Sequence, residues 1–131
     1  MAAVIVVDTC VLIALFDPAD AHHDEAEALL SAHAGEDVAV SVLSVAEFLV
    51  HPTLQGAADT ARQALAQIGV SVLPVPAGAE TSLAATRARS RLRMPDAVVL
   101  HLALTSHADV MTFDDSLAKA ARAAGVGVMG A

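Results

Sequence analysis

The sequence contains no tryptophan and no tyrosine, and only three of its 131 residues are phenylalanine. Proteins that bind single-stranded nucleic acid without sequence preference stack the bases on exposed aromatic rings, so we do not expect binding of that kind. Lysine and arginine are also few: seven bases stand against 15 acids, which gives a formal net charge of −8. Taken alone, this charge argues against a nucleic-acid partner unless bound cations neutralise part of it.

Cysteine occurs once, at Cys10, so no disulfide can form within the chain and we expect a reducing, cytoplasmic environment. No apolar run approaches the roughly 20 residues that span a bilayer. The apolar N-terminal stretch has no basic start and is interrupted by Asp8, so we predict neither a signal peptide nor a membrane partner. The length of 131 residues predicts one domain over 1–131, and an apolar fraction of 56% allows a well-filled core.

Short apolar runs alternate with longer segments of helical character along the whole chain. The predicted strands are Val4–Val7, Val38–Ser41, Val70–Val75, Ala108–Thr112 and Val126–Met129. The predicted helices are Thr9–Phe16, a segment from Asp20 or His22 to about His33, Ser44–His51 ended by Pro52, Leu54–Gln67 closed by Gly69, Ala79–Leu92, Pro95–His107 and Ser116–Ala124. This alternation predicts an α/β protein with a parallel sheet and helices on both of its faces.

Four acidic residues occupy positions that meet at one edge of such a sheet. Asp8 and Asp114 follow predicted strands, whereas Glu47 and Asp96 lie in the first turns of predicted helices. Ligands of open parallel sheets bind beyond the carboxyl ends of the strands, and four carboxylates there would repel one another unless a cation lay among them. An all-oxygen set suits Mg²⁺ or Mn²⁺, and such ions activate water for phosphodiester hydrolysis.

Each acid also has a purely structural interpretation. Asp8 could cap the helix that follows it, and Asp96 lies in a first turn where a negative charge complements the helix dipole. The segment Ser44-Val45-Ala46-Glu47 fits a capping box, in which the glutamate would bond back to the capping residue. Asp114 and Asp115 compete for one N-cap position, and we assign the cap to Asp115 and the metal to Asp114.

Four short motifs occur in order along the chain: Val7-Asp8-Thr9, Ser44-Val45-Ala46-Glu47, Met94-Pro95-Asp96-Ala97, and Thr112-Phe113-Asp114 followed by Leu117. Together they resemble the motifs of the PIN-domain nucleases and are most similar to those of VapC-type toxins of bacterial toxin–antitoxin pairs, although Leu117 stands where members often have Phe. The resemblance implies a PIN-like three-layer sandwich with about five parallel strands, and Mg²⁺- or Mn²⁺-dependent endoribonuclease activity. The implied catalytic and metal-binding residues are Asp8, Glu47, Asp96 and Asp114. The supporting residues would be Thr9, Thr112 and Asp115.

The resemblance also implies three partners: an RNA substrate, a small cognate antitoxin whose basic or apolar tail covers the site, and a second copy of the chain in a homodimer. We hypothesise that Arg91 or Arg93 contacts RNA phosphates, because both lie close in sequence to Asp96. A solvated helix end, where arginine is favoured, is an equally good interpretation of this basic segment.

Two other functions remain open. One is a catalytically inert PIN-like interaction module, whose acids would only cap helices. The other is a phospho-acceptor signalling domain, which would need a lysine at the acidic site, whereas the only lysine, Lys119, lies in the last predicted helix. The six histidines show no metal-binding spacing, and we interpret Cys10 as a small buried side chain rather than a nucleophile.

Overall fold

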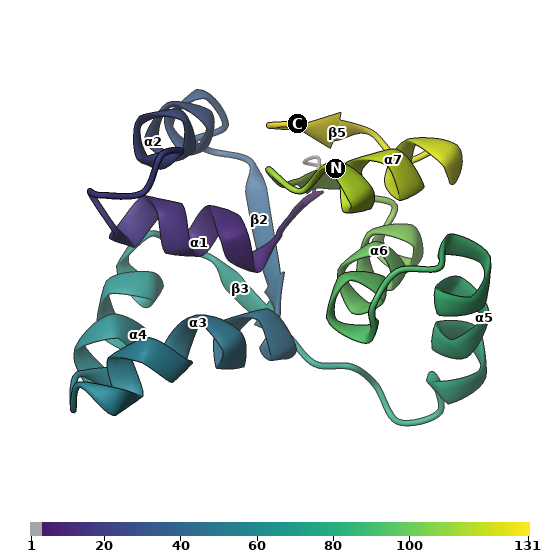
Figure 1. Ribbon diagram of the computed structural model, residues 1–131, viewed down its shortest axis with the longest axis horizontal. Coiled ribbons are helices and arrows are strands. Elements are labelled where there is room, and N and C mark those ends of the chain that lie inside the picture. Colours follow the sequence, from purple (N-terminus) through teal and green to yellow (C-terminus); the bar gives the residue numbers. More distant parts are fainter. Residues whose placement is uncertain (1–3) are drawn as a thin grey trace.

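The computed structural model describes residues 4–131, which form a five-stranded parallel sheet flanked by helices (Figure 1). The strands are β1 Val4–Val7, β2 Asp37–Ser41, β3 Ser71–Leu73, β4 Asp109–Met111 and β5 Val128–Met129. The helices are α1 Thr9–Phe16, α2 His23–Ala32, α3 Val42–Leu54, α4 Ala58–Gln67, α5 Glu80–Ser90, α6 Met94–Ser106 and α7 Asp115–Ala123. The strand order is β3-β2-β1-β4-β5, and every neighbouring pair is parallel, which confirms the predicted α/β sandwich.

The central strand of the sheet is β1, a run of β-branched residues that is paired on both sides. Val6 lies opposite Ala39 of β2 and opposite Val110 of β4. Beyond the end of β1, the backbone N–H of Asp8 donates to the carbonyl of Met111 at 2.9 Å. Because the chain leaves β1 in one direction toward β2 and returns on its other side to β4, the carboxyl end of β1 is a switch point of the kind where ligands bind.

The two faces of the sheet bury separate cores, as the alternation of side chains along a strand requires. Ile5 and Val7 of β1 and Met111 of β4 pack in one core with α1, α2, α3 and α4. Val6 of β1 and Val110 of β4 point the other way, into a core with α6 and α7. Figure 1 shows this division, with α1 to α4 grouped on one side of the molecule and α5 to α7 on the other.

The start of α3 differs from the prediction. The helix begins at Val42, and its N-cap is Ser41, whose hydroxyl accepts the backbone N–H of Leu43 at 3.1 Å. Ser44 is therefore inside the helix and Glu47 lies in its second turn, so the capping-box interpretation is wrong. The serine at the end of the preceding strand has the extended backbone that an N-cap needs, and it takes the role that the sequence motif had suggested for Ser44.

The end of α3 also differs, because Pro52 lies inside the helix and the last helical residue is Leu54. A proline removes one helical N–H, but the carbonyls of the final turn still accept hydrogen bonds from Gln55 and Ala57. The next helix consequently begins at Ala58 rather than Leu54, after a turn at Gly56 with a φ of 69°. The other elements have the predicted type and order; β1 and α1 have the predicted bounds, and the ends of the rest are displaced by a few residues.

Replacing Ser41 by alanine should lower the free energy of unfolding by about 1 kcal/mol, the usual value of an N-cap serine. The matched control is Ser44→Ala, because Ser44 is equally buried but takes no part in the cap. In the helix interior alanine is the better helix former, so the control should cost less than Ser41→Ala. Urea denaturation of the two variants measures both values, and equal losses would contradict the assignment of the cap.

None of the helices within residues 4–131 has the length and the apolar run that crossing a lipid bilayer requires.

Candidate active site

Asp8 lies at the centre of the rim that the carboxyl ends of the strands form, and its side chain is only 5% exposed. Its Oδ1 accepts the backbone N–H of Thr9 at 2.8 Å, so Asp8 caps α1. Its Oδ2 accepts the hydroxyl of Thr112 at 2.8 Å and the thiol of Cys10 at 3.2 Å. The capping interpretation therefore holds, and three donors also fix the orientation of the carboxylate.

Thr112, which directly follows β4, is a buried link between two of the predicted acids. Its hydroxyl donates to Asp8 and accepts the backbone N–H of Asp114 at 3.0 Å. A hydroxyl has one proton and two lone pairs, so it can perform both tasks at once. Thr112 thus sets the distance between the turn that carries Asp114 and the end of β1.

Glu47 approaches the same rim from α3. The hydroxyl of Thr9, the first residue of α1, donates to Oε1 of Glu47 at 2.9 Å across 38 positions of sequence. Glu47 is exposed, in contrast to Asp8. Although the prediction of a first-turn position for Glu47 is wrong, the second turn of α3 still places its carboxylate beside the start of α1.

Asp96 is the third residue of α6 and is partly buried. Burial raises the pKa of its carboxyl from 3.8 to about 6, and the negative charges of Asp8, Asp114 and Glu47 also raise it, against a lowering effect of Arg93. Charges act on one another in this way only over short distances in a protein. The structure therefore brings the four predicted acids together, from β1, α3, α6 and α7.

Asp114, and not Asp115, is the N-cap of α7, so our assignment of the cap to Asp115 is wrong. Asp114 has the extended backbone of a capping residue, with φ −86° and ψ 119°, and its Oδ1 accepts the backbone N–H of Leu117 at 2.9 Å. Asp115 is the first residue of the helix and is exposed. Capping uses only one of the two carboxylate oxygens of Asp114, so it does not exclude the metal-binding role predicted for this residue.

The donor set of this site fits a hard divalent cation. Asp8, Glu47, Asp96 and Asp114 offer carboxylate oxygens, which Mg²⁺ and Mn²⁺ prefer. Burial, followed by the charge of Asp8, raises the pKa of the Cys10 thiol to about 11, so the sulfur keeps its proton at neutral pH and donates to Asp8. Cys10 therefore supports the carboxylate and does not act as a soft ligand or a nucleophile.

One feature beside the acids had no signal in the sequence. The ring of His22 stacks on that of Phe113, with centroids 4.5 Å apart and an angle of 13° between the ring planes. Phe113 stands between Thr112 and Asp114, and its backbone N–H donates to the sulfur of Cys10 at 3.4 Å. Since 91 positions of sequence separate His22 from Phe113, only the tertiary fold could reveal that they meet.

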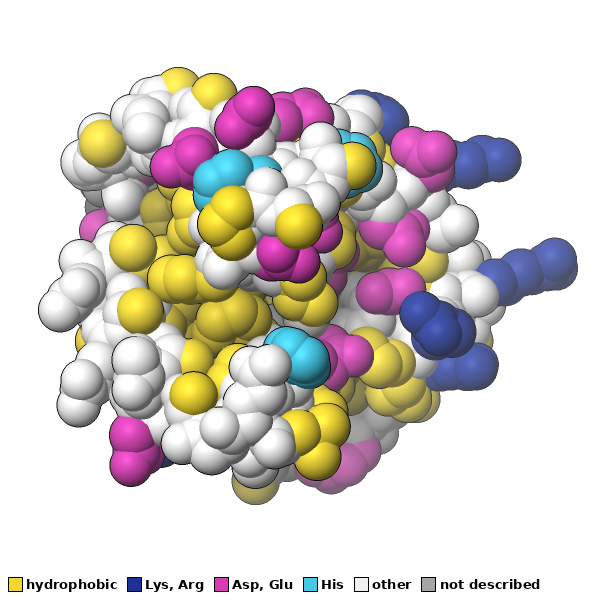
Figure 2. All heavy atoms as spheres, turned by 60° about the vertical axis from the view of Figure 1, so that its left-hand side comes forward, with side chains coloured by type: hydrophobic (Ala, Val, Ile, Leu, Met, Phe, Trp, Pro, Cys, Tyr) yellow, Lys and Arg dark blue, Asp and Glu magenta, His cyan; other side chains and the backbone are white. Residues whose placement is uncertain are grey.

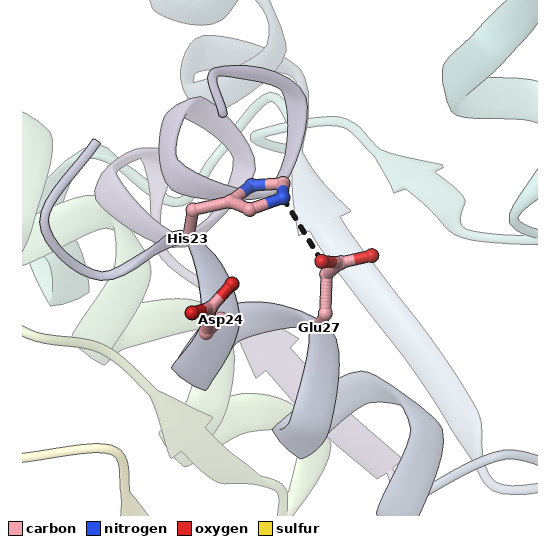
Figure 3. Close-up of side chains that lie close together, drawn as sticks. All are labelled: His23, Asp24 and Glu27. Carbon is pink, nitrogen blue, oxygen red and sulfur yellow. Dashed lines mark ion pairs between the residues drawn. The ribbon is translucent and has the colours of Figure 1, made fainter. Parts of the chain in front are cut away.

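A second group of potential ligands lies in the first turn of α2, where His23, Asp24 and Glu27 gather (Figure 3). The Nε2 of His23 pairs with Oε1 of Glu27 at 2.9 Å, and its Nδ1 is 2.8 Å from the carbonyl oxygen of Ala14. The Ala14 carbonyl raises the pKa of His23, and the charge of Glu27 adds to this effect. Both ring nitrogens have partners within the protein: the pair with Glu27 lies within α2, and the contact with the Ala14 carbonyl links α2 to α1.

The predicted RNA-contacting arginines lie in the connection between α5 and α6. Arg91 is the C-cap of α5, and Arg93 is the N-cap residue of α6; both side chains are exposed. Arg93 lies near enough to Asp96 for its positive charge to lower the pKa of that carboxyl. Arg93 therefore borders the acidic rim on the side of α6.

Comparison with known proteins agrees with this architecture. A PIN domain family profile matches residues 5–123, and the chain belongs to the PIN domain family. Among solved structures, a toxin–antitoxin complex from Klebsiella pneumoniae matches with 25% identity and a TM-score of 0.75, over 95% of this chain and 94% of that one. VapC20 of Mycobacterium tuberculosis, described as a sarcin-ricin loop cleaving toxin, matches with 23% identity and a TM-score of 0.75, over 97% and 98%.

FitAcB from Neisseria gonorrhoeae matches with 22% identity and a TM-score of 0.74, over 95% of this chain and 96% of that one. A search of curated proteins gave no match.

Proposed function

We propose that this PIN domain, a single domain over residues 1–131, is a divalent-metal-dependent endoribonuclease and the toxin of a toxin–antitoxin pair. The observation that carries the proposal is the gathering of four carboxylates at the carboxyl rim of the sheet, where burial first, and then the charges of the other three acids, raise the pKa of Asp96 to about 6. Such crowding is relieved when a cation binds. The similarity to VapC20 and to the Klebsiella toxin–antitoxin complex supports RNA as the substrate and an antitoxin as the partner.

In this proposal Asp8, Glu47, Asp96 and Asp114 hold Mg²⁺ or Mn²⁺, which supplies Lewis acidity and activates water. Thr112 and Thr9 keep two of the carboxylates in place through the hydrogen bonds described above. Arg91 and Arg93 bind the RNA backbone beside the acids. Hydrolysis adds the oxygen of water to phosphorus and breaks one phosphorus–oxygen bond, and the departing ribose oxygen leaves as a hydroxyl.

The surface of the protein supports the proposed partners. The net charge of −8 suits a basic antitoxin segment, and the exposed apolar side chains suit both an antitoxin helix and a second copy of the chain. Figure 2 shows a hollow in which apolar side chains are exposed. Most of the lysine and arginine side chains in that view lie on the opposite side of the picture. The large apolar side chains that are exposed include those of Val50 and Leu54 in α3 and Val72 in β3.

A catalytically inert PIN-like interaction module is the second candidate. The observation in its favour is that Asp8 and Asp114 both cap helices, which is a sufficient structural role for each. An inert module would need no cation, so added Mn²⁺ would leave its thermal stability unchanged.

Metal removal tests the proposal. RNA cleavage by the wild-type protein should fall by about a hundredfold or more in EDTA, since the cation supplies several kcal/mol of transition-state stabilisation. Cleavage should return when excess Mn²⁺ is added, and Mn²⁺ should raise the melting temperature of the protein because it binds only the native state. Undiminished cleavage in EDTA would contradict the metal dependence, and a protein that neither cleaves nor gains stability would favour the inert module.

A further inference from the structure

A cavity of about 660 Å³ opens between α5, α6 and α7, outside the carboxylate site. Figure 1 shows these three helices grouped on one side of the molecule. The cavity is lined at its rim by Arg89, Arg91 and Lys119, and its apolar wall includes Leu92, Leu100 and Leu104. Its volume lies within the range of about 300 to 1,000 Å³ that is usual for small-molecule sites.

The charge of this cavity is opposite to that of the protein. The chain has 15 acids and seven bases, yet three of the seven bases line the cavity, and its lining within the described residues includes no aspartate or glutamate. The hydroxyl of Ser116 adds a further hydrogen-bond donor to the lining. A concave site with converging cations and hydroxyls in an acidic protein is suited to an anionic ligand, and in particular to phosphate oxygens.

The apolar wall adds a second requirement for the ligand. Leu100 of α6 is 2% exposed and forms a rigid base, whereas Leu104, one turn later, is 38% exposed and offers its side chain to the cavity. Inorganic phosphate would gain nothing from this surface. A nucleotide carries both a flat apolar ring and a phosphate, so it matches both halves of the cavity.

The backbone at Arg91 points to the same use of this cavity. Arg91 has a φ of 60°, and it is one of two non-glycine residues with positive φ in the described part of the chain. Glycine is the usual residue at the end of a helix with this conformation, because a side chain there is strained. Arg91 therefore occupies a position that favours glycine, and it lines the cavity.

Two residues that line the cavity are close in sequence to acids of the rim. Arg91 is followed, after one residue, by Arg93, the N-cap residue of α6, and Asp96 lies in the first turn of that helix. Ser116 lies in the first turn of α7, two residues after Asp114. The start of α7 therefore carries both an acid of the rim, Asp114, and a residue of the cavity wall, Ser116.

We propose that this cavity binds a nucleotide of the RNA next to the one that is cleaved, with its base against Leu104 and its phosphate among Arg89, Arg91 and Lys119. The inference rests on the proposed ribonuclease function for the identity of the larger substrate. The binding of a nucleotide, however, needs neither the cation nor catalysis, so it can be tested separately.

The test uses the full chain in EDTA, with adenosine 5′-monophosphate, adenosine and inorganic phosphate as probes, followed by NMR of the backbone amides. We expect the monophosphate to shift amides of α5, α6 and α7 and to bind at least about fivefold more tightly than either adenosine or phosphate, because it satisfies both halves of the cavity. Shifts confined to the carboxylate rim, or equal binding of phosphate and the monophosphate, would overturn the proposal.

Two arginines on one helix give a matched comparison. Arg89→Ala should weaken binding of the monophosphate about fivefold to tenfold and lower the salt dependence of RNA binding, whereas Arg87→Ala should leave both nearly unchanged. Both residues are exposed on α5, but only Arg89 lines the cavity. Equal effects of the two variants would overturn the proposal.

A variant that fills the cavity tests whether binding needs the space of the cavity as well as its positive charge. Ala123→Phe at the end of α7 keeps every cation but should abolish the preference for the monophosphate over phosphate. If light scattering instead shows that Ala123→Phe turns a dimer into a monomer, and the monophosphate causes no shifts, the cavity is a protein interface and the nucleotide proposal is wrong. Nucleotide binding without any RNA cleavage would refute the ribonuclease function alone, while cleavage with an unchanged KM in Arg89→Ala would refute the cavity proposal alone.

Discussion

Replacing Asp8 by asparagine should reduce metal-dependent RNA cleavage by about a thousandfold, which corresponds to about 4 kcal/mol of lost transition-state stabilisation. Asp8 is the most buried of the four acids and accepts three hydrogen bonds, so its carboxylate cannot move aside to be replaced by a neighbour. The amide of asparagine has the same shape but lacks the negative charge, and its NH₂ group would face a donor. The initial rate of cleavage at saturating Mn²⁺ measures the effect.

The control for Asp8→Asn is Asp37→Asn, which removes the same charge at the opposite end of the sheet. Asp37 is the exposed first residue of β2 and lies opposite Val4 in the register of the strands. Its substitution should leave cleavage within about twofold of the wild type, since an exposed charge far from the site contributes little. Full activity of Asp8→Asn, or an equal loss of activity in Asp37→Asn, would contradict the proposal that the Asp8 carboxylate is required for cleavage.

Replacing Asp96 by asparagine should change stability and activity in opposite directions. Without metal, the pKa of Asp96 is raised from 3.8 to about 6, so the folded protein binds a proton there more tightly than the unfolded chain does. The unfavourable contribution of this carboxylate therefore grows as the pH rises from about 4 to about 6 and is fully present above that range. At pH 7.5 in EDTA, Asp96→Asn should be more stable by about 1 to 2 kcal/mol, a value reduced to allow for solvent screening.

Urea denaturation in EDTA at pH 5 and at pH 7.5 measures this effect. The gain in stability of Asp96→Asn over the wild type should be larger at pH 7.5 than at pH 5. Added Mn²⁺ should then stabilise the wild type more than the variant, and cleavage by the variant should fall by about a hundredfold or more. A variant that is less stable than the wild type in EDTA at pH 7.5 would show that the four carboxylates do not repel one another in the folded state.

Much of the fold follows from local sequence rules. Val4–Val7 is predicted with its observed bounds because a continuous β-branched run has few other uses, and α1 ends where Asp17 and Pro18 disfavour further helix. The start of α3 could not be predicted in the same way. Ser41 and Ser44 are both good capping residues, and the choice between them depends on where β2 leaves the sheet, which is a tertiary property.

The site was predictable to a similar extent. Strand ends indicate that Asp8 and Asp114 belong to one rim, but adjacent aspartates are chemically equivalent in a sequence, so the cap could not be assigned between Asp114 and Asp115. The hydrogen bond from Thr112 to Asp8 and the thiol of Cys10 behind it depend on the register of β1 and β4. No sequence pattern predicts the basic cavity between α5, α6 and α7.

The hydrogen bond between Thr112 and Asp8 joins residues that are 104 positions apart in the sequence. During translation β1 emerges before β4, so the Asp8 carboxylate at first has only its local donors, Thr9 and Cys10, and gains the hydroxyl of Thr112 after β4 has left the ribosome. The hydrogen bonds around Asp8 are consequently complete only after the 104 positions that separate it from Thr112 have been synthesised. Under the proposed ribonuclease function, a growing chain that has not yet reached β4 would lack this support for Asp8 and could not yet cleave the RNA around it.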